Sequence, residues 1–207
     1  SVLESGVPIV GLVNNAGGQF RAPLETISAN GFDAVVRNNL TGGFLVAREC
    51  YKQSMQVNGG SIVNILADMW RSMPGMGHSG AARAGMLNLT QTAAVEWANA
   101  GVRVNAVAPG YIASSGLTNY PEKDRAYISQ SRKWVPLKRF GTEAEISAAV
   151  VFLLSEAAAF ISGSCIRVDG AAPNARLDWE LQEHQNSKAF RGFPGETKLD
   201  FLSGMGN

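Results

Sequence analysis

A histidine, a serine and an arginine lie within one short segment of the sequence, where their side chains could do chemistry. Ser79 and Arg83 are four residues apart in an alanine-rich stretch, so a helix would place them on one face. A serine hydroxyl is a poor proton donor, whereas a guanidinium stays charged and offers a planar set of donors. Arg83 therefore suits ligand hydroxyls, a developing oxyanion or a neighbouring acid. His78 titrates in the physiological range when unperturbed, which makes it the candidate proton donor.

The pattern of apolar runs predicts the scaffold that positions these side chains. Short apolar runs alternate with longer helical patterns, which is typical of an α/β fold with a mostly parallel sheet. We expect strands at about residues 9–14, 61–66, 103–108 and 165–168.

Helical spacing accounts for most of the chain between these strands. Residues 28–57 carry it with a break near residues 39–43, and residues 79–100 form the longest helix, which Gly101 ends. Thr142 and Glu145 form a capping box for a helix that reaches about Ser155.

Charge and composition exclude several classes of partner. Eighteen Lys and Arg residues against 17 Asp and Glu residues give a net charge of +1, which favours neither nucleic acid nor an anionic membrane. No apolar run approaches the roughly 18 residues of a membrane span. Cys50 and Cys165 match no metal spacing and suit a reducing compartment. We expect a cytoplasmic protein without a metal that acts on a small molecule.

Six segments, taken in their order, resemble the short-chain dehydrogenase/reductase family. They are residues 14–17 (NNAG), 38–42 (NNLTG), 60–65 (GSIVNI), 103–110 (RVNAVAPG), 136–141 (PLKRFG) and 168–170 (VDG). The resemblance covers about residues 9–171 and implies a doubly wound parallel sheet of the Rossmann type, with residues 172–207 as a tail. The Gly-rich turn that this family uses for a pyrophosphate does not occur before Asn14, so we expect an N-terminally incomplete domain.

The resemblance implies NADP, or NAD, as the cofactor. It gives the following contacts at strand ends and on the long helix: Asn14, Ala16, Gly17, Arg83, Pro109, Gly110, Ile112 and Ser114. Asn-Gly and Pro-Gly pairs are also common in plain turns, which is the alternative for residues 14–17 and 109–110.

The resemblance also implies the catalytic candidates, and here the sequence departs from the family. Ser79 and Arg83 stand where the family has a tyrosine and a lysine, and Ala67 takes the place of the serine that usually binds the substrate carbonyl. Asn39 matches the active-site asparagine of the family. The candidates are therefore Asn39, His78, Ser79 and Arg83, and the missing tyrosine puts direct reduction of a carbonyl in doubt.

One branch of the family is most similar. Residues 18–20 (GQF) and 78–85 (HSGAARAG) resemble the peroxisomal-type trans-2-enoyl-CoA reductases. That resemblance implies reduction of a 2-enoyl thioester such as an acyl-CoA, in which fixed donors stabilise charge on the thioester oxygen. A short-chain dehydrogenase of alcohols or carbonyls, for example a terpenoid alcohol, and a non-catalytic subunit remain alternatives.

The second half of the chain raises the question of assembly. Residues 111–135 correspond to the substrate lid of the family, or else form a surface loop with a short amphipathic helix. The tail carries four large aromatic residues, Trp179, Phe190, Phe193 and Phe201, which need a surface on this subunit or on a neighbour. Family members commonly form tetramers through helices corresponding to residues 41–57 and 79–100. We expect a homo-tetramer in which the tail crosses onto another subunit.

Overall fold

The computed structural model describes residues 6–119, 121–193 and 199–202, so residues 194–198 and 203–207 of the tail lie outside the described part. The chain divides into two compact units. The first comprises Ser1–Val107 and Val150–Ile166, and the second comprises Ala108–Ala149 and Arg167–Asn207. Each unit is described by itself.

A parallel sheet forms the centre of the first unit. Its strands, in spatial order, are β1 (Gly11–Asn14), β2 (Gly60–Ile65), β3 (Val102–Pro109) and β6 (Cys165–Val168). The register sets Asn14 opposite Asn64 and Asn64 opposite Ala106, so β1, β2 and β3 end at the same edge. All four strands lie within two residues of their expected positions, and the α/β class is confirmed.

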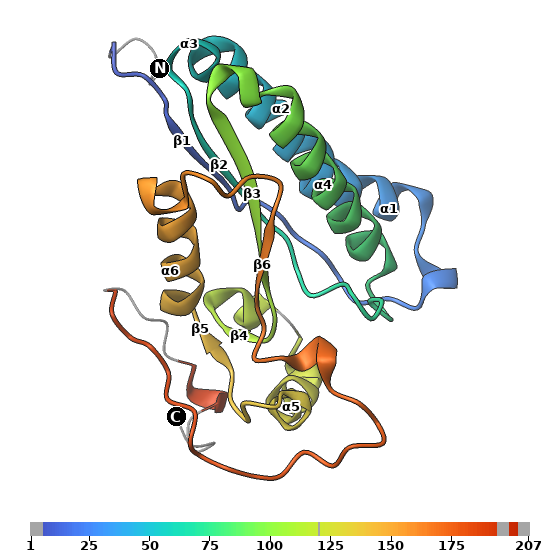
Figure 1. Ribbon diagram of the computed structural model, residues 1–207. Helices are drawn as coiled ribbons and strands as arrows, with labels where there is room; N and C mark the ends of the chain where they lie inside the picture. The colour runs from blue at the N-terminus through green and yellow to red at the C-terminus, as the bar shows by residue number, and fades with distance from the viewer. Residues whose placement is uncertain (1–5, 120, 194–198, 203–207) are drawn as a thin grey trace. The chain divides into compact units, whose positions relative to one another are not determined.

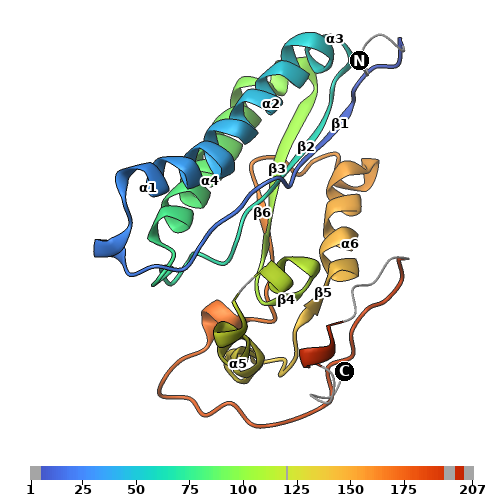
Figure 2. The same cartoon turned by 180° about the vertical axis from the view of Figure 1, so that it is seen from behind.

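Helices α2 and α4 cover one face of β1, β2 and β3 (Figures 1 and 2). The helical segments of this unit are α1 (Ala29–Val36), a π-helix (Arg37–Thr41), α2 (Gly42–Cys50), a second π-helix (Tyr51–Met55), α3 (Gln56–Asn58) and α4 (Gly77–Glu96). Short 3-10 turns span Leu24–Thr26, Ala98–Ala100 and Glu156–Ala158. The expected break near residues 39–43 is wrong, because the helix continues there and only widens into a π-turn. Gly101 follows the last turn with a φ of 71°, as its place after the long helix predicts.

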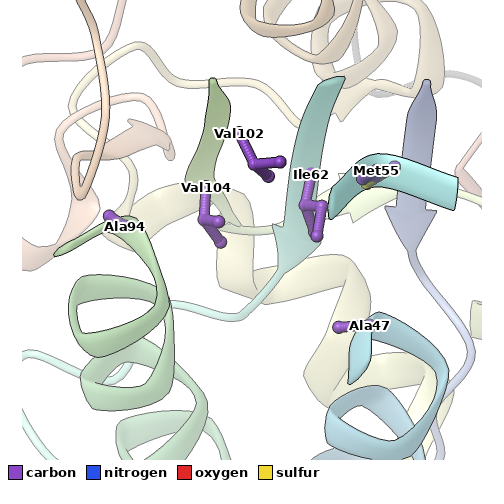
Figure 3. Close-up of a cluster of buried hydrophobic side chains, with 6 residues drawn as sticks. All are labelled: Ala47, Met55, Ile62, Ala94, Val102 and Val104. Carbon is purple, nitrogen blue, oxygen red and sulfur yellow. The ribbon is translucent and has the colours of Figure 1, made fainter. Parts of the chain in front are cut away.

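Apolar side chains between the sheet and these helices form the core of the first unit. Its buried members are Ala47, Met55, Ile62, Ala94, Val102 and Val104 (Figure 3). Trp97 packs against this cluster and stacks on Tyr51, with ring centroids 4.5 Å apart. The alanines at 47 and 94 leave room for this close packing of helix on sheet.

Two polar side chains attach residues 150–166 to the same sheet. The hydroxyl of Ser61 donates to the carbonyl oxygen of Leu153 at 2.9 Å. The guanidinium of Arg103 donates to the carbonyl oxygens of Leu153 and Ser155 at 2.8 and 3.1 Å. Arg103 thus satisfies carbonyl groups at the end of a helix, which have no partner within the helix itself.

The second unit contains two very short strands and two helices. Strand β4 (Ile112–Ala113) pairs in parallel with β5 (Gly141–Thr142), and the helices are α5 (Glu122–Gln130) and α6 (Glu143–Leu154). The last turns of α6 belong to the first unit. Short 3-10 turns span Ser115–Asn119, Ser131–Trp134, Ala172–Asn174 and Asp200–Leu202. The capping box is confirmed: Glu145 N donates to Thr142 Oγ1 at 3.2 Å, and Thr142 N donates to Glu145 Oε2 at 2.9 Å.

The described part of the tail is bound to residues 136–145 of its own chain. Lys138 pairs with Glu183 at 3.2 Å, and Arg139 Nε donates to Ser187 Oγ at 2.9 Å. The hydroxyl of Thr142 donates to the carbonyl oxygen of Phe190 at 2.8 Å. These bonds correspond to the alternative in which the tail packs on its own subunit.

Glu145 joins the helix cap to the tail, and we predict that Glu145→Gln destabilises the second unit. Burial works to raise the pKa of the Glu145 carboxyl, but hydrogen bonds from Arg139, Thr142 N and Phe190 N outweigh it and lower the pKa. Loss of a charge-assisted bond costs about 1.5–3 kcal/mol, which corresponds to roughly 3–12 °C in the unfolding midpoint at this size.

The pH dependence follows from the direction of that shift. A carboxyl with a lowered pKa in the folded state stabilises the fold above its unfolded pKa of about 4.3, and this stabilisation is lost as pH falls through the folded pKa. The difference in unfolding midpoint between wild type and Glu145→Gln should therefore be largest near pH 7 and should disappear in acid. Thermal unfolding at several pH values measures it. Glu156→Gln, at an exposed carboxylate, is the control. A gap that is the same at every pH would contradict the assignment.

Candidate functional site

The carboxyl end of β1 is tied to its neighbours by the side chain of Asn14. Its amide donates to Asn64 Oδ1 at 2.8 Å and to the carbonyl oxygen of Gly43 at 3.2 Å. Asn64 in turn donates to Thr90 Oγ1 at 2.9 Å, which connects the sheet to α4. The donors of the predicted cofactor residue Asn14 thus hold the strand end in place.

The loop after β1 passes directly against Asn39 and Arg83. A Cβ atom at Gly17 would lie 2.5 Å from Asn39 Oδ1 and 2.7 Å from Arg83 Nη2. A larger residue here would have to displace the side chain of Asn39 or Arg83, so contact rather than backbone angles favours glycine at this position. The contact brings together residues that are 22 and 66 positions beyond Gly17 in the chain.

Arg83 is the cation of this group. Its Nη1 donates to the carbonyl oxygen of Ile65 at the end of β2, and its Nε is buried without a hydrogen-bond partner. Among the described residues no carboxylate pairs with Arg83, so the alternative of a neighbouring acid is not realised there. Burial lowers the pKa of the guanidinium, which nevertheless stays charged.

Asn39 is buried inside the π-helix and clamps the loop. Its amide nitrogen donates to the carbonyl oxygens of Gly18 at 2.6 Å and Val35 at 2.8 Å, and its Oδ1 accepts from Gly18 N at 3.2 Å. Helices often widen into π-turns at functional sites, and here the wider turn coincides with the clamp.

His78 and Ser79 open α4 and are fully buried. Nδ1 of His78 accepts from Ser79 N at 2.8 Å, so the neutral ring carries its proton on Nε2, which has no partner among the described residues. The ring of Phe20 meets His78 edge-on, with centroids 4.4 Å apart. The hydroxyl of Ser79 donates to Gln19 Oε1 at 2.5 Å.

The remaining predicted cofactor residues belong mostly to the second unit. Gly110 N donates to the carbonyl oxygen of Val168 at 3.0 Å, and a Cβ atom at Gly110 would lie 2.7 Å from Asp169 Cα. Ile112 lies in β4, and the carbonyl oxygen of Ser114 accepts from Leu117 N at 3.0 Å. Pro109 is the last residue of β3.

In the first unit the structure therefore brings together Gly17, Asn39, His78, Ser79 and Arg83 from three separate segments. Ala16 lies exposed in the same loop. Two further residues join this group without having been predicted to do so: Gly18, held by Asn39, and Gln19, held by Ser79. In the sequence they stand out only as part of residues 18–20, which resemble the enoyl-CoA reductase branch, and nothing there indicates their contacts.

The chemistry of this group is that of an anion-stabilising site. It combines a charged guanidinium with an unpaired buried Nε, a bare glycine backbone and an imidazole Nε2 that carries a proton. These features fit a ligand rich in hydroxyl and carbonyl oxygens. Among the described residues, no group of three His, Cys, Asp or Glu side chains could hold a metal ion. Within the same residues, no helix has the length and apolar character that crossing a membrane requires.

The sequence is similar to a known family and to named enzymes. The family model described as enoyl-(acyl carrier protein) reductase matches residues 2–171. The chain is 41% identical over 165 residues to the Bacillus subtilis (strain 168) protein named "Probable 2,4-dienoyl-CoA reductase [(2E)-enoyl-CoA-producing]". That match covers 77% of this chain and 64% of the relative, so the chain spans a little under two thirds of the relative's length.

Two solved structures of dehydrogenases are similar to this chain. The citronellol catabolism dehydrogenase (AtuB) of Pseudomonas aeruginosa PAO1 is 59% identical, with a TM-score of 0.72 over 83% of this chain and 65% of that chain. A gluconate 5-dehydrogenase from Burkholderia cenocepacia J2315, solved in complex with NADP and tartrate, is 32% identical, with a TM-score of 0.76 over 84% of this chain and 69% of that chain.

The contact at Gly17 gives a direct test of the site geometry. We predict that Gly17→Ala lowers the unfolding midpoint, because the added methyl group must displace Asn39 or Arg83. Overpacking of this kind costs about 1–3 kcal/mol. Gly18→Ala is the matched control, since its Cβ would lie 3.4 Å from Asn38 Nδ2, which can move. Equal midpoints for the two variants would contradict the close approach of Gly17 to Asn39 and Arg83.

Proposed function

The chain belongs to the short-chain dehydrogenase/reductase family, and we propose that its enzyme is an NAD(P)H-dependent reductase of 2-enoyl thioesters. The substrate class we propose is an acyl-CoA with a C=C bond conjugated to the thioester. NADP is the proposed cofactor, with NAD as its alternative. The name of the B. subtilis relative, which describes a reductase of unsaturated acyl-CoA, supports this substrate class.

The residues present fit a nicotinamide dinucleotide. Arg83 and Asn39 lie directly against the loop at Gly17, and Arg83 retains a buried Nε without a partner among the described residues. We assign the contacts to the residues named from the sequence: Asn14, Ala16, Gly17, Arg83, Pro109, Gly110, Ile112 and Ser114. When bound, the reduced cofactor supplies a hydride.

The observation that carries the proposal is a buried guanidinium without a carboxylate partner in the described residues. In conjugate reduction the hydride adds to the β carbon, and negative charge develops on the thioester oxygen. A preorganised cation and its N–H donors stabilise that charge, and a proton added at the α carbon completes the reaction. Reduction of a carbonyl would instead leave an alkoxide that needs an acidic donor at once, and no phenol occupies position 79.

The other three catalytic candidates receive distinct roles in this proposal. Asn39 fixes the loop beside Arg83 through Gly18. His78 is proposed as the proton carrier: its Nε2 is buried without a described partner, and the ring would give up a proton only as the imidazolium, which requires Nδ1 to release Ser79 N and take up a proton first. Ser79 contributes a hydroxyl to the site rather than a proton, since its pKa is far above that of a phenol or an imidazole.

A second function is favoured by the 59% identity to the citronellol catabolism dehydrogenase. Under that alternative the enzyme oxidises a terpenoid alcohol, and a residue other than Ser79 must accept the hydroxyl proton. Two assays on the full-length protein separate the functions: NADPH consumption with a 2-enoyl-CoA, and reduction of NADP or NAD with citronellol. A protein that binds neither dinucleotide would instead support the non-catalytic alternative.

We predict that Arg83→Ala in the full-length protein lowers turnover of a 2-enoyl-CoA by about a hundredfold or more, because it removes charged donors from the developing oxyanion. NADPH affinity should fall with it. Ser79→Ala removes one neutral hydrogen bond and should cost about tenfold or less. Steady-state kinetics and a fluorescence titration of NADPH measure the two effects. Wild-type behaviour of both variants would place the site elsewhere.

We also propose that the enzyme is a cytoplasmic homo-tetramer that associates through the helices at residues 41–57 and 79–100. Val95 on α4 is 79% exposed, whereas Ala94 beside it is buried in the core. We predict that Val95→Lys weakens the assembly, since a charge at the centre of an interface must be desolvated. Light scattering measures the mass, and Leu177→Lys, at an exposed residue outside both helices, is the control. A monomeric wild type would contradict the proposal.

A further inference from the structure

The hydroxyl of Ser79 has its direction fixed by Gln19. Ser79 Oγ and Gln19 Oε1 are 2.5 Å apart, and a side-chain amide oxygen can only accept. A serine hydroxyl has one proton and two lone pairs, so this bond uses its entire donor capacity. Ser79 is fully buried in this structure, and while the bond is intact its hydroxyl has only lone pairs to offer a ligand group that reaches it.

The loop that carries Gln19 is held on both sides of that residue. Gly18 is clamped by two hydrogen bonds from Asn39, at 2.6 and 3.2 Å. Phe20 packs edge-on against the fully buried ring of His78. Gln19 is thus anchored between fixed neighbours although it is itself exposed, and its bond to Ser79 spans 60 residues of sequence.

We propose that Gln19 is a positioning residue, which acts through Ser79 by holding its hydroxyl as an acceptor for a ligand hydroxyl. The inference rests on the proposed reductase function. A thioester oxygen has no proton to give, so a ligand partner of Ser79 has to be a donor, and the ribose hydroxyls of the nicotinamide cofactor are the donors we propose. Ser79 then contributes to cofactor affinity, and the proton for the α carbon comes from another group.

A double-mutant cycle in the full-length protein tests the coupling. Gln19→Leu should weaken NADPH binding by about threefold to tenfold when Ser79 is present, the size of one net hydrogen bond. In a Ser79→Ala background the same change should have little effect, because Gln19 acts through that hydroxyl. Fluorescence titration gives the dissociation constants without any substrate. Gln56→Leu, at an exposed glutamine away from the site, should leave them unchanged.

Gln19→Glu adds a second measurement, the pH dependence of NADPH affinity, which a purely structural role of Gln19 would not change. An ionised carboxylate accepts the Ser79 proton as the amide oxygen does, so NADPH affinity should be retained near pH 7. As pH falls through the carboxyl pKa, about 4.3 when unperturbed, the protonated form donates to Ser79 and affinity should fall. Wild type lacks this carboxyl and should lack this pH step.

The outcomes separate the positioning role from the proposed reaction. Equal effects of Gln19→Leu with and without the Ser79 hydroxyl would overturn the positioning role, even if 2-enoyl-CoA is reduced. Coupling in NADPH binding without reduction of 2-enoyl-CoA would support the positioning role and overturn the substrate class. A full-length protein that binds neither dinucleotide would overturn this inference together with the cofactor assignment.

Discussion

The guanidinium of Arg83 constrains the rest of the site, because a buried cation has to lie among acceptors. The sheet provides one of them, the carbonyl oxygen of Ile65 at the end of β2. The guanidinium also lies against Gly17, where an added Cβ would have to displace Arg83 or Asn39. Contact therefore favours a glycine in the loop after β1, and Asn39 holds this loop from the π-helix. One charged side chain thus accounts for the residue types in three segments that are distant in sequence.

Some parts of this arrangement are predictable because they depend on local chemistry. The capping box at Thr142 and Glu145 and the turn at Gly101 need only a few neighbouring residues, and both have the expected form. The strands follow from short runs of apolar residues bounded by turn residues. The helix at residues 79–100 begins two residues earlier than expected, a difference typical of helix ends.

Other parts depend on partners that no local pattern reveals. The π-turn at Arg37–Thr41 keeps a helical sequence pattern, so the polar and glycine residues there suggested a break instead. Strands β4 and β5 are two residues each and carry no periodicity. The contact of Gln19 is also not predictable from its neighbours in sequence, because its partner is the hydroxyl of Ser79, 60 residues away. That no carboxylate in the described part of the chain pairs with Arg83 also becomes visible only in the folded structure.

The type of side chain at position 79 bears on which reaction the site can support. A phenol can lose its proton near the range of an enzyme's working pH when a cation lies beside it, but a serine hydroxyl cannot. A site with a guanidinium and a buried serine is therefore better suited to stabilising charge than to delivering a proton. Conjugate reduction places the charge on an oxygen and the proton on a carbon, so the two tasks can fall to different groups. Direct interconversion of an alcohol and a carbonyl places both tasks on one oxygen. One relative is named for dienoyl-CoA reduction and a solved neighbour for citronellol catabolism, and the serine at position 79 is our reason for proposing the first chemistry.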